Sequence, residues 1–250
     1  MNAVALGGGG DVVVTGGYDQ SVRAWDTRSN SFDAIQTVAP FKDSVTSVLL
    51  DAHVITAASV DGTMRAFDCR AGRCRTDTLG APVTVLAPSG DGACVLAALA
   101  ASRLRLLDRA SGALLADYAA PGRHVNAGAR CGAGLLAGDA HVAAASENGR
   151  VNFWELVDAA VVASLQAHAP GKTARAPSAC ARAHAQCGSQ RFPKLAFSVP
   201  ASLPLTSSLR CAQVCGLACH PREAAMLSCA TDGLVKAWAA PPPGQRGEED

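Results

Sequence analysis

Aromatic and charged residues are both scarce in this sequence. Aromatic residues make up 4% of its 250 residues, and charged residues make up 17%. Lys and Arg number 22 against 21 Asp and Glu, so the formal net charge is +1. Nucleic-acid binding depends on many Lys and Arg contacts to phosphate groups, which a near-neutral chain does not supply. We therefore expect no direct nucleic-acid binding, and the charge balance gives no reason to expect a membrane surface as a partner.

Long apolar runs are missing too. The longest candidates, such as residues 94–101, fall well short of the roughly 18 residues that cross a bilayer as a helix. The opening residues 1–6 are too short for a signal peptide, and four glycines follow them at once. The ten cysteines form no regular framework of spacings, which favours a reducing compartment. The sequence thus predicts no membrane association and a cytoplasmic or nuclear location.

Signatures of catalysis and of cofactor binding are also lacking. Neither G-x-S-x-G nor H-E-x-x-H occurs, and no pair of carboxylates stands in a plausible cleft. Residues 171–173 read GKT, like the end of a phosphate-binding loop, but Gln166 stands where that motif needs glycine. The sequence therefore predicts a protein that is not an enzyme, holds no cofactor and takes no small-molecule substrate.

Zinc ligands by residue type gather in the C-terminal third of the chain. These residues are Cys180, His184, Cys187, Cys211, Cys215, Cys219 and His220. Their spacings are not those of common zinc fingers, so we expect no metal site. Cys215 and Cys219 fall in a strand-like run, and we predict that they are small core residues.

What the sequence does contain is a repeat. The string SVRAWD at 21–26 returns in altered form at 63–68, 103–108, 150–155 and 234–239. Each copy carries one large apolar residue, and these are Trp25, Phe67, Leu107, Trp154 and Trp238. Their spacing is about 40 residues, doubled before the last copy, and such a period is the signature of a repeat array. The chain is therefore predicted to be one array in which each unit buries its faces against its neighbours.

Each unit is predicted to consist of short strands joined by turns, because β-branched and apolar residues alternate with Gly- and Asp-rich breaks. The units are placed at about 1–40, 41–80, 81–122, 123–168 and 214–240 of an array spanning 1–240. Four strands are expected in each unit except the last, which has three. The predicted strands are 1–6, 12–17, 21–26, 34–38, 44–50, 53–59, 63–68, 74–79, 83–89, 94–100, 103–108, 114–119, 125–136, 141–146, 150–155, 161–166, 214–220, 225–230 and 234–239.

Residues 171–213 interrupt the array. They lack a strand pattern and contain Pro177, Pro193, Pro200 and Pro204. So long a segment without strands is uncommon between elements of a compact domain. It is either a disordered insertion or translated non-coding sequence from the gene, and we favour the second. The Pro-rich, acidic tail 241–250 is predicted to be disordered.

Four-stranded units of this length that end in Trp-Asp resemble the repeats of WD40 β-propellers. In that family an Asp stands six residues before the Trp, and here the position holds Asp19, Asp61, Ala101, Asn148 and Asp232. A short acceptor in that turn can bind backbone N–H groups and fix the hairpin. A second set of acids, Asp26, Asp68 and Asp108, directly follows the large residue. Because they occupy equivalent places in separate units, they cannot converge on one substrate.

A basic residue recurs two positions before the large residue. It is Arg23, Arg65, Arg105 and Lys236. It lies on the same face of the strand as the large residue, so its stem can pack on that ring. A basic stripe for RNA or for an acidic partner is the alternative, but the fixed repeat position favours a structural role.

Longer stretches resemble a narrower group. Residues 18–29, 59–74, 104–118 and 146–168 look like the mitogen-activated protein kinase organizer group of WD-repeat proteins. The resemblance implies a scaffold for extracellular-signal-regulated kinase modules, or a subunit of spliceosomal complexes, and therefore protein partners. It also implies seven repeats where five are recognisable. We therefore predict an N-terminally incomplete version of a seven-bladed propeller, with a closed five-bladed ring as the alternative.

Overall fold

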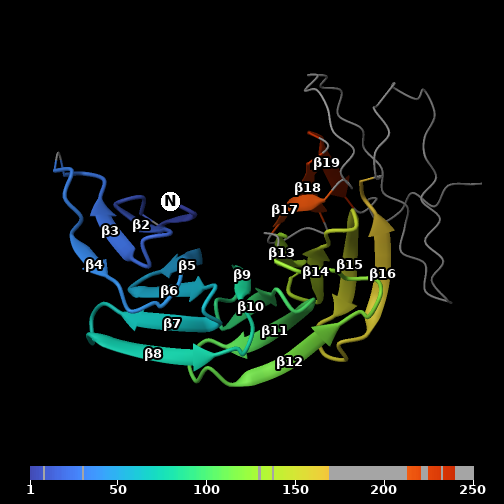
Figure 1. Ribbon diagram of the computed structural model, residues 1–250, viewed down its shortest axis with the longest axis horizontal. Coiled ribbons are helices and arrows are strands. Elements are labelled where there is room, and N and C mark those ends of the chain that lie inside the picture. The colour runs from blue at the N-terminus through green and yellow to red at the C-terminus, as the bar shows by residue number, and fades with distance from the viewer. Residues whose placement is uncertain are drawn as a thin grey trace, which may run out of the picture. The chain divides into compact units, whose positions relative to one another are not determined.

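The computed structural model describes residues 1–7, 9–29, 31–128, 131–136, 138–168, 213–220, 225–231 and 233–239. Within these ranges the regular structure is entirely strand, arranged in antiparallel sheets (Figure 1). The same ranges hold no helix of the length and hydrophobicity needed to cross a membrane. Residues 171–212 of the predicted insertion, the tail 241–250 and the predicted turn residue Asp232 all lie outside the described residues.

The described strands form four sheets of four strands and one sheet of three, each in chain order. The first sheet holds β1 (Ala3–Leu6), β2 (Val12–Gly16), β3 (Val22–Asp26) and β4 (Gln36–Val38). The second holds β5 (Val45–Asp51), β6 (Val54–Ser59), β7 (Thr63–Asp68) and β8 (Arg73–Thr78). The third holds β9 (Val83–Pro88), β10 (Cys94–Leu99), β11 (Arg103–Asp108) and β12 (Leu114–Ala119). The fourth holds β13 (Ala133–Leu136), β14 (His141–Ala145), β15 (Arg150–Glu155) and β16 (Val161–Gln166), and the last holds β17 (Val214–Cys219), β18 (Ala225–Ala230) and β19 (Val235–Ala239).

The all-β prediction and the expectation of four short strands per repeat are confirmed. Strand boundaries agree with the predicted ones to within two residues, except that β13 covers only the end of the predicted segment 125–136. The agreement follows from burial: β6 and β10 are buried on both faces, whereas the outer strand β8 is mostly exposed and reads RCRTDT. Apolar inner strands and polar outer strands are what stacked sheets require.

The described chain divides into two compact units. The first comprises Met1–Ala119 and Asn126–Arg130, and the second comprises Ala120–Val125 and Cys131–Asp250. The first unit contains the sheets β1–β4, β5–β8 and β9–β12, and the second contains β13–β16 and β17–β19. The predicted extents of the repeats, and the expected total of seven, stay predictions.

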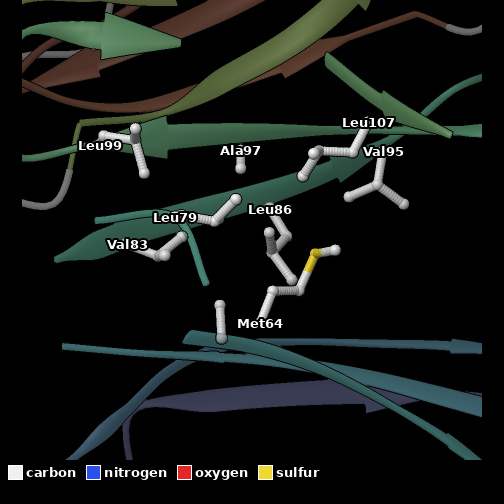
Figure 2. Close-up of a cluster of buried hydrophobic side chains, with 9 residues drawn as sticks. Met64, Leu79, Val83, Leu86, Val95, Ala97, Leu99 and Leu107 are labelled. Atoms are coloured by element: carbon white, nitrogen blue, oxygen red, sulfur yellow. The ribbon is translucent and has the colours of Figure 1, made fainter. Parts of the chain in front are cut away.

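Two apolar clusters hold the first unit together. One lies between the first and second sheets and includes Val14, Phe41, Val45 and Ile55. The other lies between the second and third sheets and is drawn in Figure 2, where Met64 of β7 reaches toward Leu86 of β9. Side chains with at most 5% exposure fill this second cluster. Each fully buried Leu or Val contributes roughly 1.5–3 kcal/mol relative to an exposed one, so these clusters dominate the packing energy.

Candidate interaction surface

Asp61 fixes the turn between β6 and β7. Its Oδ1 accepts hydrogen bonds from the backbone N–H of Thr63 at 2.9 Å and from the Thr63 hydroxyl at 2.6 Å. Its Oδ2 accepts the backbone N–H of Lys42 at 3.0 Å. Partial burial opposes ionisation, but the hydrogen bonds from Thr63 and Lys42 outweigh it, and the pKa of Asp61 is lowered. The carboxylate thus ties its own hairpin to the segment that connects the first sheet to the second.

In the other sheets, the turns before the third strand are held by similar hydrogen bonds. In the fourth sheet, Asn148 Oδ1 accepts the backbone N–H of Arg150 at 3.1 Å, and its Nδ2 donates to the Arg123 carbonyl at 3.0 Å. In the first sheet, Asp19 accepts the Ser21 hydroxyl at 2.7 Å, which lowers the pKa of Asp19. Ala101 offers no acceptor, and its turn is held instead by the neighbouring Ser102 Oγ, which accepts the backbone N–H of Asn126 at 2.9 Å.

The acids that directly follow the large residues, Asp26, Asp68 and Asp108, lie in a second set of turns. Asp26 Oδ1 accepts the backbone N–H of Arg28 at 2.9 Å, and Asp68 Oδ1 accepts that of Arg70 at 2.9 Å. Asp108 accepts the backbone N–H of Ser111 at 3.0 Å. These turns follow the third strand of each sheet, whereas Asp19, Asp61 and Asn148 precede it. One strand of six residues therefore separates Asp61 from Asp68, or roughly 20 Å, so the two carboxylates cannot act together on one substrate.

The large residues find their partners on neighbouring segments. Trp25 Nε1 donates to Thr15 Oγ1 at 2.9 Å, and Trp238 Nε1 donates to Ser228 Oγ at 2.9 Å. His168, which follows β16, has its Nε2 3.1 Å from the same Ser228 Oγ, so an imidazole of that segment joins the hydroxyl and the indole of the last sheet in one chain.

The other three large residues make ring contacts or apolar contacts. The ring of Phe67 meets Phe41 edge-on at 6.4 Å, and the ring of Trp154 meets His124 edge-on at 5.6 Å. Leu107 is 2% exposed and lies in the second apolar cluster. These repeat positions are packing positions in all three sheets.

The recurrent basic residues reach across to the preceding sheet. Arg105 Nη1 donates to the Leu79 carbonyl at 2.8 Å, and Lys236 Nζ donates to the Ala167 carbonyl. Both acceptors directly follow an outer strand, β8 or β16. The sequence predicted that the stem of the basic residue packs on the large residue of its own strand. That prediction did not include these carbonyl acceptors, because a backbone acceptor leaves no pattern in the side chains. The ring contact made by Arg65 is with Phe41, at 5.1 Å, and that ring in turn packs on Phe67.

A groove opens between the outer parts of the first and second sheets. Its volume is about 280 Å³, and its lining is mostly apolar. Its lining contains charged side chains of both signs, Asp68 and Arg73, and the apolar residues Val22, Ala24, Val38, Ile55 and Phe67. We call this feature the inter-sheet groove.

The groove lies beside β4, which is three residues long and carries Gln36 where the equivalent strand carries a longer Arg. Gln36 of β4 pairs with Ala24, and Arg75 of β8 pairs in the same way with Ala66. Arg75 fills the corresponding gap between the second and third sheets, where its Nη1 donates to the carbonyls of Arg109 and Ala110. Gln36 lines the groove without filling it. The motifs of the sequence do not point to this groove; the signal for it is the contrast between Gln36 and Arg75 at one repeat position.

The cysteine prediction is partly wrong. Cys215 and Cys219 do lie in β17, but Cys215 is exposed and only Cys219 is partly buried, which raises the pKa of its thiol to about 11. The pairing of β17 with β18 shifts register between Val214 and Gly216, so Cys215 stands at an irregularity of the strand and not in the packed core. Cys180, His184, Cys187 and Cys211 lie outside the described residues, and the described ones contain no cluster of three metal-ligand side chains.

Together, these strands and turns form an all-β protein of antiparallel sheets, most of them four-stranded, with the strand pattern of WD40 repeats. The family described as "WD domain, G-beta repeat" matches residues 1–26. The WD repeat domain-containing protein 83 of Rattus norvegicus is 38% identical over 138 residues, which cover 55% of this chain and 43% of that protein. The proteins of the same name from Homo sapiens (38% over 133 residues, covering 53% and 41%) and Xenopus tropicalis (39% over 138 residues, covering 55% and 43%) are similar to it as well.

These comparisons support the WD40 repeat family for this chain, in agreement with the resemblance found in the sequence. The matched part spans less than half the length of each of these relatives. Proteins of this family generally serve in protein–protein interaction. The candidate interaction surfaces are therefore those that the contacts between neighbouring sheets do not cover.

Proposed function

We propose that this chain is a non-catalytic scaffold for protein–protein interaction that organises the components of a mitogen-activated protein kinase module in the cytoplasm or nucleus. The observation that carries the proposal is the inter-sheet groove. Its lining combines apolar residues with Asp68 and Arg73. One apolar side chain of a partner can therefore be buried there, while polar groups beside it fix the orientation of the partner. Protein interfaces draw most of their energy from a few such anchors. The resemblance to the kinase organizer group supports the choice of partner.

The groove has the size of a side-chain pocket. A volume of about 280 Å³ accommodates one large apolar side chain of a partner together with part of its backbone. Ile35, which directly precedes β4, is 62% exposed and extends the apolar surface beside the groove. The opposite charges of Asp68 and Arg73 favour a partner segment with polar groups flanking its anchor, because charge complementarity fixes orientation more than it adds affinity.

The test replaces Gln36 with Arg in the full chain. By analogy with Arg75, the longer side chain is expected to fill the groove and to donate to the carbonyls of the turn after β7, so the fold is kept while the site closes. The matched control is Thr37→Arg, because Thr37 is the next residue on β4, is exposed and does not line the groove. Both variants add the same charge at the same edge of the sheet.

Tagged chains are purified from cells, and the bound kinases are quantified by mass spectrometry. We expect Gln36→Arg to reduce kinase recovery roughly tenfold, which corresponds to about 1.4 kcal/mol, while Thr37→Arg leaves recovery unchanged. Equal recovery with both variants would exclude the groove as the binding site. Recovery of spliceosomal proteins without kinases would replace the kinase module by a structural role in pre-mRNA splicing.

A further inference from the structure

The connection between β3 and β4 exposes a basic side chain, a hydroxyl and an aromatic ring within five residues (Figure 1). The Arg28 side chain is 72% exposed, Ser31 is exposed, and Phe32 is 97% exposed. Arg28 precedes Ser31 by three positions, and Phe32 follows it directly. Arg-directed protein kinases recognise a sequence of this kind through acidic residues that pair with the Arg. An exposed connection is also open to an enzyme that has to enclose its substrate.

The fold separates Ser31 from other residues with the same sequence signal. In the described part of the chain, the hydroxyl residues with an Arg three positions before them are Ser31, Thr76 and Thr78. Thr76 and Thr78 lie in β8, which is paired with β7 along its whole length. A kinase binds its substrate as an extended segment, and a strand must leave its sheet before it can be bound in that way. Ser31 lies outside the strands and needs no such opening.

The Arg residues before these hydroxyls differ in how firmly they are held. Arg75, three positions before Thr78, donates to two backbone carbonyls of the turn after β11. Arg28 lies 3.5 Å from Asp11 and 3.9 Å from Asp26, in ion pairs that are largely open to solvent. Such exposed pairs contribute little free energy, so the Arg28 guanidinium can turn to a carboxylate of an approaching enzyme.

Ser31 belongs to a turn that a phosphate would rearrange. Its backbone N–H donates to Ser29 Oγ at 3.1 Å, and its own Oγ accepts the backbone N–H of Asp33 at 3.1 Å. The Ser31 hydroxyl also donates to Asp33 Oδ2 at 3.3 Å. A phosphate at this oxygen would be repelled by the Asp33 carboxylate and attracted by the Arg28 guanidinium. Modification would therefore change the charge and the conformation of the segment that leads into β4.

We infer that Ser31 is a phosphorylation site for a protein kinase that selects Arg three residues before its target. ATP supplies the phosphoryl group. The Ser31 Oγ forms a bond to the γ-phosphorus of ATP, and the bond from that phosphorus to the oxygen bridging it to the β-phosphate breaks. ADP leaves, and the hydroxyl proton passes to a carboxylate of the kinase.

This kinase belongs to a different class from those of the proposed function. Mitogen-activated protein kinases modify Ser or Thr that is followed by Pro, and no Ser or Thr of this sequence is followed by Pro. The expected kinase therefore acts on the chain as its substrate and is not one of the components that the scaffold is proposed to organise. The inference does not depend on the proposed function.

The experiment measures phosphate at each residue of the purified full chain. The chain is incubated with Mg²⁺, ATP and a calmodulin-dependent protein kinase, whose substrates carry Arg at this position, and the products are quantified by mass spectrometry. We expect Ser31 to be modified, while Thr76 and Thr78 stay unmodified in the folded chain. Arg28→Ala should slow the modification of Ser31 roughly tenfold, which is the effect of losing one charge-assisted hydrogen bond to the kinase.

The matched control is Arg70→Ala. Arg70 follows the third strand of the second sheet as Arg28 follows that of the first, and the backbone N–H of each binds an Asp carboxylate. Both side chains are exposed, so both variants should keep the fold, which circular dichroism checks. Arg70→Ala should leave the rate at Ser31 unchanged. A parent chain without phosphate at Ser31 would overturn the inference, as would equal slowing by the two variants. Modification of β8 at the rate of Ser31 would show that the fold does not select the site, and the inference would fail.

Discussion

Replacing His124 with Phe is expected to stabilise the protein and to remove part of its acid sensitivity. His124 is 3% exposed and packs edge-on against Trp154 at 5.6 Å. Among the residues that the structure describes, none is a hydrogen-bond partner for either of its ring nitrogens. Burial lowers its pKa from 6.5 to about 4, against a small opposing effect of the Glu147 charge. A Phe ring preserves the edge-on contact, in the geometry that Phe41 has with Phe67. It also contains no buried polar atom that would need a hydrogen-bond partner.

The size of the effect follows from proton linkage. A histidine with a depressed pKa is neutral in the folded state, so the unfolded chain binds more protons between the two pKa values. Stability is therefore fully present above pH 6.5 and is lost as the pH falls toward 4. For the shift from 6.5 to about 4, the loss at about pH 5 is about 2 kcal/mol relative to about pH 7.5. At neutral pH, removal of the unpaired nitrogens adds roughly 1–3 kcal/mol of stability.

Urea unfolding of the two proteins at both pH values, followed by tryptophan fluorescence, measures this difference. The stability gap between variant and parent should widen by about 2 kcal/mol on acidification. The converse substitution, Phe41→His, should destabilise the protein and add acid sensitivity, because Arg65 lies over that ring at 5.1 Å and repels a protonated imidazole. A gap that is the same at both pH values would show that His124 is not held neutral by burial, and the reasoning would fail.

Two further substitutions test the turns and tethers by stability measurements. Gly112 has φ of 77°, and a Cβ there would lie 2.8 Å from Asp77 Cγ, whereas Gly72 in the equivalent turn has φ of 61° and open space. Gly112→Ala should therefore cost roughly 1–3 kcal/mol more than Gly72→Ala, and equal costs would contradict the close approach. Lys236→Met should cost about 1–2 kcal/mol through the lost bond to the Ala167 carbonyl, and Lys236→Arg should recover most of it; a neutral Met variant would show that this tether contributes nothing.

The strands of this protein could be predicted from the sequence because their signals are local. Residues 63–68 read TMRAFD between a Gly turn and an Asp turn, and the structure places β7 at Thr63–Asp68. The hairpin before it requires a residue with positive φ, which Gly62 supplies at 80°. Each of these features needs only a few neighbouring residues, so periodicity and turn chemistry were sufficient to find them.

The candidate site could not be predicted because its determinants lie far apart in the chain. The inter-sheet groove combines Ala24 and Gln36 of the first sheet with Phe67 and Arg73 of the second. It is open because the side chain of Gln36 is too short to close it. The role of His124 is equally non-local. Its ring packs edge-on against Trp154, whereas His168 Nε2 lies 3.1 Å from the hydroxyl of Ser228. Propensity and spacing contain no information on such cross-sheet partners.

The roles of the repeat positions determine which residues can give this protein its binding specificity. Residues that recur from unit to unit, such as Asp61, Trp25 and Arg105, are engaged in turns, in contacts within a sheet or in contacts between sheets. A tether that recurs in each unit cannot distinguish one partner from another, because it presents the same chemistry at each blade. Selective binding must then come from positions at which one unit departs from the others. Gln36 is such a position, since its equivalent Arg75 closes the gap that Gln36 leaves open. Departures from the repeat are thus better guides to the function of this chain than the repeat itself.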